Sequence, residues 1–287
     1  MMYGWLIFAS FLWGSNVLVM RYMLEYVSTY YLATIKVFLS ILAILFVMRY
    51  KKVKFKRRRD FLGLKVAIFS ITINFILTFE GLNLISGSSN AIINSLAPLI
   101  TILLAWVLYK NKVSKNQLIA MSVACIAFLI SINFKVQQLS LGHLMLVGGI
   151  IFYSYGNLLI QHDCKKEDNL TFTLEYLSYG FIQLLIISIL FPQSNNFGDI
   201  SIMLWILFIL FSGIGFAIIQ LIYFRAVHEI GSVKTSFLLG LNPVFTYIGS
   251  LLLQEPFDFS KMMAMVLMVG AMFIANRNNL LDKQKDS

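Results

Sequence analysis

Polar side chains recur at four-residue spacing within otherwise apolar stretches of this chain. Residues four apart share one face of a helix, so each set forms a stripe. The stripes are Ser70, Asn74 and Thr78; Ser86, Asn90, Asn94 and Thr101; Tyr153, Asn157 and Gln161; and Glu175, Tyr179 and Gln183. Amides and hydroxyls exchange hydrogen bonds with a polar solute, and in an apolar helix they favour a protein interior or a wet cavity. The stripes therefore predict a binding cavity.

Further single residues extend this set of candidates. They are Ser10, Trp13, Gly14, Gln220 and Thr246. The alternative for any single serine, glycine or asparagine is helix packing, because small and polar residues are common at packed membrane interfaces. For Asn90 and Asn94 we favour the cavity, since neighbouring Pro98 frees backbone groups.

Two charged residues lie within apolar stretches at matching places. A shift of 139 residues puts Lys36 on Glu175 and Thr34 on Thr173. A charge at the centre of a bilayer costs about 2.5–3.5 kcal/mol on insertion scales, so it needs a functional or local explanation. We expect Lys36 nearer the outside and Glu175 nearer the inside, each meeting a charged group of a solute or a coupling proton. The alternatives are a Lys36 that reaches the headgroups and an interfacial Glu175.

Motifs for other chemistries are missing from the sequence. It contains no GxxxxGK[ST], no HExxH and no CxxC pair, so neither ATP hydrolysis nor a metal or other cofactor is predicted. The stretch Gly87-Ser88-Ser89-Asn90 leaves open an intramembrane serine hydrolase with His143 as the base. That alternative requires direct hydrogen-bond reach between the serine and the histidine.

The amino-acid composition indicates whether the protein surface faces water or lipid. The chain is 59% hydrophobic and 13% charged, with a mean hydropathy of +0.80, whereas about a quarter of an ordinary soluble domain is charged. Such a surface must face lipid. Two cysteines give no disulfide framework, and the net charge of +10 comes from loops between apolar runs rather than from a nucleic-acid surface.

Ten apolar segments are long enough to be candidate spans, some of them short. We expect helices at 4–21, 29–48, 62–81, 86–109, 116–134, 141–161, 170–190, 201–223, 232–253 and 261–277. None shows the alternation of a barrel strand. The predicted fold is an all-helical membrane protein.

The basic residues predict the orientation of these spans. With a cytoplasmic N-terminus, outer connections hold only Arg21, Lys135 and Lys261 of the 23 Lys and Arg residues, and the run at 49–60 is inside. Cytoplasmic loops carry an excess of such residues. We therefore expect a plasma-membrane protein with both termini in the cytoplasm.

The chain also repeats itself. Residues 80–131 align without a gap on 225–276, with Pro98 on Pro243 and Thr101 on Thr246. Five helices per half is an odd number, so the second half enters the membrane inverted. We expect two repeats, 1–137 and 138–287, with a solute site between them near the midplane, as in many secondary transporters.

Three stretches carry a family resemblance. WGSNVLVMRYM (13–23), SSNAIINSLAPLITILLAWVLYKNKVS (88–114) and NPVFTYIGSLLLQEP (242–256) resemble the EamA type of the drug/metabolite transporter superfamily. The chain has Tyr109-Lys110 and Gln254-Glu255 where that family has Gly-Glu, so no role is assigned to that pair. Lys36 stands where members of the family often carry an arginine.

The resemblance implies a transporter rather than an enzyme. The expected solute is a small metabolite such as an amino acid or its analogue, exported by alternating access. The candidate binding residues are Trp13, Lys36, Asn74, Asn90, Asn94, Tyr153, Asn157, Glu175, Tyr179, Gln220 and Thr246. The partners are the solute and the lipid bilayer, without nucleic acid, and the apolar spans permit a monomer. A non-transporting membrane scaffold or receptor is the other alternative.

Overall fold

The computed structural model describes residues 2–55, 60–131, 140–164, 169–231, 235 and 238–285, and the regular structure in these ranges is helical. The helices before residue 132 are α1 (Met2–Met23), α2 (Thr29–Tyr50), α3 (Leu62–Val66), η1 (Ala67–Ile73), α4 (Asn74–Leu84), α5 (Gly87–Asn94), α6 (Ala97–Tyr109) and α7 (Lys115–Ser131). Those after residue 139 are α8 (Leu141–Asp163), α9 (Asn169–Leu190), η4 (Phe197–Asp199), α10 (Ile202–Leu207), η5 (Phe208–Ile214), α11 (Gly215–Ile230), α13 (Asn242–Leu252) and α14 (Phe259–Lys285).

By length and composition, seven helical stretches of the described chain can cross a bilayer. They are Met2–Met23, Thr29–Tyr50, Leu62–Leu84, Ile92–Tyr109, Leu141–Asp163, Asn169–Leu190 and Ile202–Ile230. Two shorter apolar helices, Lys115–Ser131 and Phe259–Ala275, match two further predicted spans. The ninth predicted span is represented by α13. Apolar runs in lipid form helices because the backbone must satisfy its own hydrogen bonds, and the prediction of an all-helical membrane protein is confirmed.

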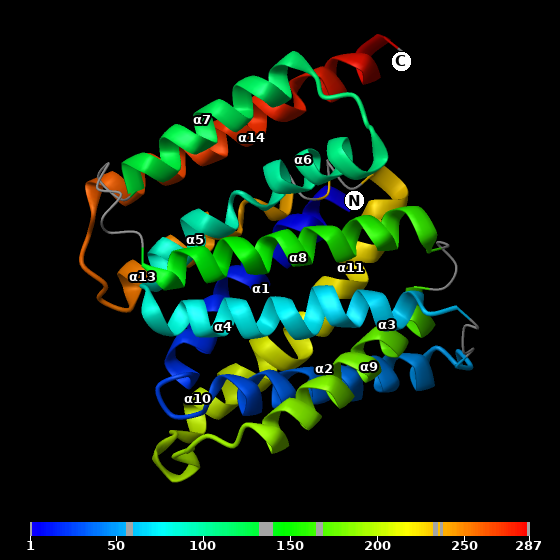
Figure 1. Cartoon of the computed structure of the whole chain (residues 1–287), viewed down its shortest axis with the longest axis vertical. Coiled ribbons are helices and arrows are strands. Elements are labelled where there is room, and N and C mark those ends of the chain that lie inside the picture. The colour runs from blue at the N-terminus through cyan, green and yellow to red at the C-terminus, as the bar shows by residue number, and fades with distance from the viewer. Residues whose placement is uncertain are drawn as a thin grey trace.

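Helices from the two halves of the chain pack in matching pairs. The last helices, α7 and α14, run side by side (Figure 1), and α2 packs against α9. The pairing of α1 with α11 is mirrored by that of α8 with α4. The pairing of α1 with α13 is mirrored in the same way by that of α8 with α6. This exchange of equivalent partners is what two inverted repeats produce.

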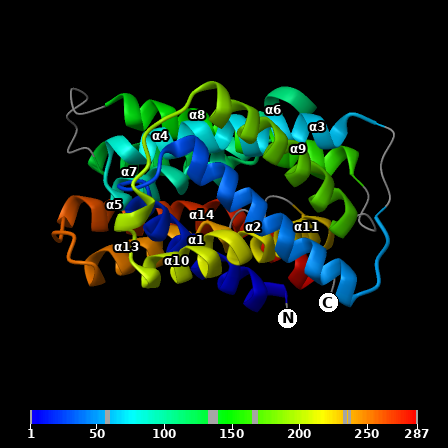
Figure 2. The same cartoon turned by 90° about the horizontal axis from the view of Figure 1, so that it is seen from below.

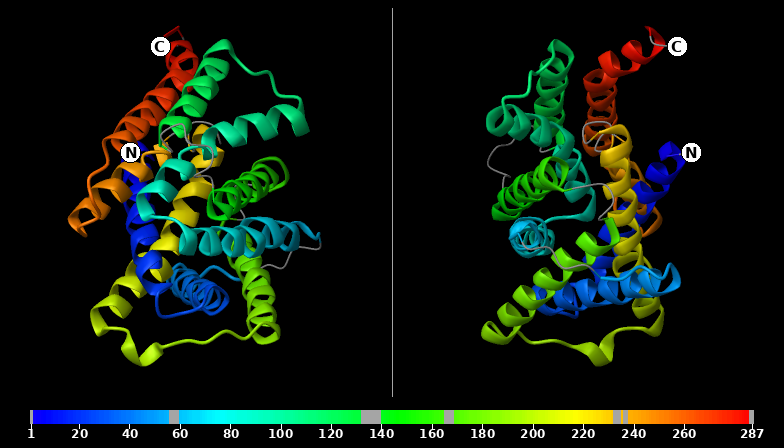
Figure 3. Two further views of the ribbon diagram at one scale, coloured as in Figure 1. Left: turned by 60° about the vertical axis from the view of Figure 1, so that its left-hand side comes forward. Right: turned by 90° about the vertical axis from the view of Figure 1, so that its right-hand side faces the viewer.

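The α7–α14 pair occupies one edge of the bundle, as both views in Figure 3 show. Its contact is lined by Ala120, Ala124 and Ala127 of α7 and by Ala264 and Ala271 of α14. Small residues let membrane helices approach closely. The start of α1 and the end of α14 lie at the same end of the bundle (Figure 2).

Two predicted spans are interrupted rather than continuous. The predicted helix 86–109 breaks at Ser95–Leu96 into α5 and α6, and Pro98 lies in the first turn of α6. In the predicted helix 232–253, a turn at Gly240–Leu241 precedes α13, which has Pro243 in its first turn. Proline lacks the N–H that would continue the preceding helix, and it fits the first turn of a new one.

The third and eighth predicted spans each contain a π-helical segment. Segment η1 separates α3 from α4, and η5 separates α10 from α11. The α-helix resumes at Asn74 in one case and at Gly215 in the other, so Phe75 and Phe216 are each the second residue after the π-segment. Single π turns often mark functional sites.

Some predictions fall outside the described residues. These are the part of the basic run at 56–59, Lys135, the expected repeat boundary at 137–138 and residues 232–234 of the ninth predicted span.

Candidate binding cavity

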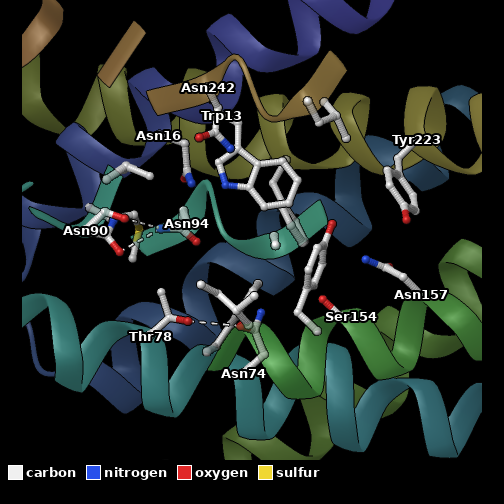
Figure 4. Close-up of a pocket in the computed structure, with 18 of the residues that line it drawn as sticks. Trp13, Asn16, Asn74, Thr78, Asn90, Asn94, Ser154, Asn157, Tyr223 and Asn242 are labelled. Atoms are coloured by element: carbon white, nitrogen blue, oxygen red, sulfur yellow. Dashed lines mark hydrogen bonds between the residues drawn. The ribbon is translucent and has the colours of Figure 1, made fainter. Parts of the chain in front are cut away.

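A cavity lies in the middle of the bundle, bounded by helices from both halves of the chain. Its empty volume, including the part open to solvent, is about 950 Å³. The polar and aromatic residues on its wall are Trp13, Asn16, Lys36, Asn74, Phe75, Thr78, Phe79, Asn90, Asn94, Thr101, Tyr153, Ser154, Asn157, Phe216, Tyr223 and Asn242. Figure 4 shows that the labelled ones, among them Trp13, Asn74, Asn94 and Asn242, come from helices far apart in the sequence and face one common space.

Seven of the eleven candidate residues line this cavity. They are Trp13, Lys36, Asn74, Asn90, Asn94, Tyr153 and Asn157. Residues four apart lie on one face of a helix. In α4, α5 and α8 the face that carries the asparagines is the one that lines the cavity. Binding of a solute by these residues stays a prediction.

The other four candidates do not belong to the cavity wall. Glu175 of α9 is 4% exposed and lies against Gly63, where an added Cβ would be 3.0 Å from its carboxyl carbon. Tyr179 packs at the edge of the main apolar core, and Gln220 of α11 is buried. Thr246 is buried behind the wall, where its hydroxyl donates to the Asn242 carbonyl at 3.1 Å and to the Gly14 carbonyl at 3.4 Å.

Several wall residues were missed by the sequence analysis. Asn16 follows Trp13 by three residues and so shares its helix face, which is a signal that could have found it. Asn242 directly precedes Pro243, where the matching residue of the first half is Ala97. Ser154 precedes Asn157 by three residues, and Tyr223 follows Gln220 by three, so the same signal could have found both.

The α5 part of the wall is an asparagine pair. The Asn94 amide donates to Asn90 Oδ1 at 2.8 Å and also to the Asn90 carbonyl at 3.0 Å. Asn90 is fully buried, and its Nδ2 has no hydrogen-bond acceptor among the described residues. A buried donor without an acceptor costs about 1–3 kcal/mol. The wall therefore presents a donor that a ligand oxygen can satisfy.

The opposite part of the wall is built from α4, α6 and α8. Thr78 donates to Asn74 Oδ1 at 3.0 Å, and Thr101 donates to Ser154 Oγ at 3.1 Å. The amide of Asn74 is bonded to the carbonyl of Ser70 at 3.1 Å. These bonds orient the side chains of Asn74, Thr78 and Thr101.

An aromatic pair joins the first helix of each half. The rings of Trp13 and Tyr153 meet edge to face, with centroids 5.5 Å apart and an interplanar angle of 78°. Such pairs contribute about 0.5–1.5 kcal/mol beyond the area they bury. Behind Trp13, Gly14 allows α1 to approach α13 closely.

Lys36 projects into this interior rather than towards the lipid headgroups. It is 2% exposed, and its Nζ lies 4.6 Å from the ring centroid of Phe216, 4.7 Å from Phe75 and 5.4 Å from Phe79. Among the described residues its hydrogen bond is to Asn16 Oδ1, at 3.3 Å. A cation over an aromatic face gains about 0.5–2 kcal/mol. The alternative that Lys36 reaches the membrane surface is wrong for this structure.

The described residues give no support to metal binding or to serine hydrolysis. Within the described parts of the chain, no three His, Cys, Asp or Glu side chains lie together in a way that could hold a metal ion. His143 caps its own helix, with Nδ1 2.9 Å from Ser140 Oγ, so this ring nitrogen is engaged away from the serines of α5.

Comparisons with known proteins agree with this architecture. The uncharacterized transporter YyaM of Bacillus subtilis (strain 168) is 27% identical over 210 residues, which cover 70% of this chain and 68% of the relative. A protein known from a crystal structure superposes with a TM-score of 0.70 over 98% of both chains, and at 15% identity this likeness shows the fold alone.

The sequence pattern of the EamA-like transporter family matches residues 1–133 and 140–277. Members of that family have ten helices in two repeats, which confirms the predicted fold class, and the family falls in the predicted drug/metabolite transporter superfamily. The chain therefore belongs to the EamA-like transporter family and is a multi-pass membrane protein of the transporter class.

Proposed function

We propose that this protein exports a small polar metabolite, an amino acid or an analogue of one, across the plasma membrane by alternating access. The observation that carries the proposal is the position of the cavity between the two halves of the chain. Its wall takes Trp13, Lys36 and Asn94 from the first half, and Tyr153 and Asn242 from the second. Rocking of one half against the other would open such a cavity first to one side and then to the other.

The chemistry of the wall supports a polar solute of metabolite size. Six asparagines face the cavity, and amides both donate and accept hydrogen bonds. Apolar side chains such as Val17, Met20 and Ile150 lie between them. A few convergent polar groups in a largely apolar pocket are typical of small-molecule sites. The direction of export is proposed from the resemblance to EamA-type exporters.

The proposed orientation places both termini in the cytoplasm. It is supported by the basic run at 49–60, which the positive-inside rule assigns to the cytoplasmic side.

The test is counterflow of a metabolite panel in proteoliposomes. Vesicles with the purified protein should exchange one class of labelled metabolite faster than protein-free vesicles. The matched control is the Asn90→Leu/Asn94→Leu double variant, in which two polar groups of the wall are replaced by apolar ones of similar size. If the wild type moves none of the panel, the scaffold or receptor alternative gains and the transport proposal fails.

A further inference from the structure

We infer that the wall around Lys36 is a subsite for the carboxylate of the transported solute, and that an amino group on that solute is dispensable. The inference rests on the proposed function and names the chemical class of its substrate. Three observations support it: the charge of the wall, the surroundings of Lys36, and the N-termini of two helices that line the same cavity.

The ammonium of Lys36 is buried with little to balance its charge. It contacts the rings of Phe75 and Phe216 and the amide oxygen of Asn16, none of which carries a negative charge. An ammonium has three N–H donors, and the bond to Asn16 uses one of them at 3.3 Å. A buried charge is stable when it is paired and hydrogen-bonded. A bound carboxylate supplies both the pairing and the missing acceptors.

The described cavity wall contains no aspartate or glutamate that could take this role. Lys36 is the one formally charged side chain among the described residues that line the cavity. Glu175, the residue at the matching sequence position, lies against Gly63 and not on this wall. A solute that carries an ammonium but no carboxylate would therefore meet a positive wall without a compensating negative group.

Two helix starts add partial positive charge on the same wall. Helix α6 begins with Ala97 and Pro98, helix α13 begins with Asn242, and all three residues line the cavity. The macrodipole gives a helix start about half a positive charge. The N–H groups of Leu99 and Ile100 already donate to the Leu96 carbonyl, and that of Val244 donates to the Leu241 carbonyl, so the two starts contribute a positive field rather than free donors. Interrupted membrane helices of transporters direct such ends at anionic groups of their substrates.

Asn90 provides an independent observation that points to a ligand. Its Nδ2 is a fully buried donor without an acceptor among the described residues. Figure 4 shows its side chain beside Asn94, on the part of the wall that also holds Asn16 and Asn242. An acceptor-rich group such as a carboxylate satisfies this donor. One lysine and neutral donors suit a single negative charge better than a phosphate dianion.

The first measurement compares binding of matched ligands to the wild-type protein. The ligands are leucine, isocaproate (which lacks the amine), leucinamide (which lacks the acid) and isopentylamine (which has only the amine). A second set has the phenylalanine skeleton: phenylalanine, hydrocinnamate, phenylalaninamide and phenethylamine. These skeletons are chosen because apolar Val17 and Met20 and aromatic Trp13 line the cavity. Affinities come from ligand-induced shifts of the melting temperature in detergent.

We expect the two acids of at least one set to bind, with or without the amine, and the amide and the amine to bind at least tenfold more weakly. Hydrogen bonds to charged groups contribute about 1.5–3 kcal/mol, which corresponds to roughly tenfold to 150-fold in affinity. Lys36→Met should weaken the acids by that factor, whereas Lys36→Arg should keep most of the affinity. Lys65→Met is the matched control, because Lys65 is exposed and off the cavity wall.

The outcomes separate the subsite from the transport proposal. Amide or amine binding as tight as that of the acid, or no binding by any of the acids, overturns the carboxylate subsite. This comparison uses the wild type, so it stands even if Lys36→Met fails to fold. Counterflow confined to uncharged solutes or amines also overturns the subsite but leaves a transporter. Acid-selective binding without any counterflow supports the subsite and overturns the proposed function.

Discussion

Gly14 is a position where a single added methyl group should have a large structural effect. An added Cβ would lie 2.9 Å from the Asn242 carbonyl oxygen, 2.9 Å from the Thr246 backbone nitrogen and 2.9 Å from Phe245 Cβ. Two of these are backbone atoms of α13 that cannot rotate away. Gly14→Ala must therefore push α1 and α13 apart, at the junction that carries Trp13 and Asn242 into the cavity.

The expected magnitude follows from two opposing terms. Overpacking a well-packed contact costs about 1–3 kcal/mol. Alanine regains at most about 1 kcal/mol of helix propensity over glycine. The hydrogen bond from Thr246 to the Gly14 carbonyl, already long at 3.4 Å, would be stretched further. We expect a net loss of about 1–2 kcal/mol in the free energy of unfolding, and a melting temperature lower by several degrees.

The matched control is Gly4→Ala in the same helix. No atom lies within 4 Å of a Cβ added at Gly4, so this variant keeps the propensity gain without the clash. Melting of the detergent-solubilised proteins, followed by size-exclusion chromatography after heating, measures both variants side by side. If Gly14→Ala melts at the temperature of Gly4→Ala, the close approach of α1 to α13 is not the tight contact described here.

The remaining predictions concern the cavity and the orientation. Asn94→Leu should reduce transport at least tenfold with little change in melting temperature, because an interhelical hydrogen bond averages only about 0.6 kcal/mol in membranes. Its control is Asn83→Leu, which changes an exposed asparagine off the cavity wall. Unchanged transport by Asn94→Leu would mean that the Asn90–Asn94 pair serves packing alone. In a background without Cys125 and Cys164, Ser194→Cys should react with an impermeant thiol reagent in intact cells, and Lys54→Cys only after permeabilisation. Both positions are exposed, and the opposite pattern would place the termini outside.

The asparagines of the cavity wall could largely be predicted because two strong constraints act on them. Lipid makes any buried amide in an apolar helix conspicuous, and helical geometry groups residues four apart on one face. Asn74, Asn90, Asn94 and Asn157 were found in this way. The repeat within the sequence, together with the odd number of helices in each half, predicted the inverted arrangement.

Where the prediction and the structure differ, the location of the residue depends on tertiary geometry. Glu175 and Lys36 match in sequence, yet Lys36 points into the cavity and Glu175 packs beside α3. A shift along the sequence aligns positions and does not determine which face of the helix is turned inwards. The π-segments η1 and η5 carry no composition signal of their own. The breaks before α6 and α13 were signalled by Pro98 and Pro243, although each of these spans was predicted as one continuous segment.

The two halves place equivalent phenylalanines around a lysine that comes from the first half only. Phe75 and Phe216 occupy equivalent places after π-segments in the two halves, and both rings contact the single ammonium of Lys36. Under the proposed rocking motion, Lys36 and Phe75 move together, while Phe216 belongs to the other half. If the motion separates these groups, the contact between Lys36 and Phe216 is lost in one of the two states, at a cost of about 0.5–2 kcal/mol. A bound anion would offset that cost by pairing with the ammonium, so the solute itself would stabilise that state.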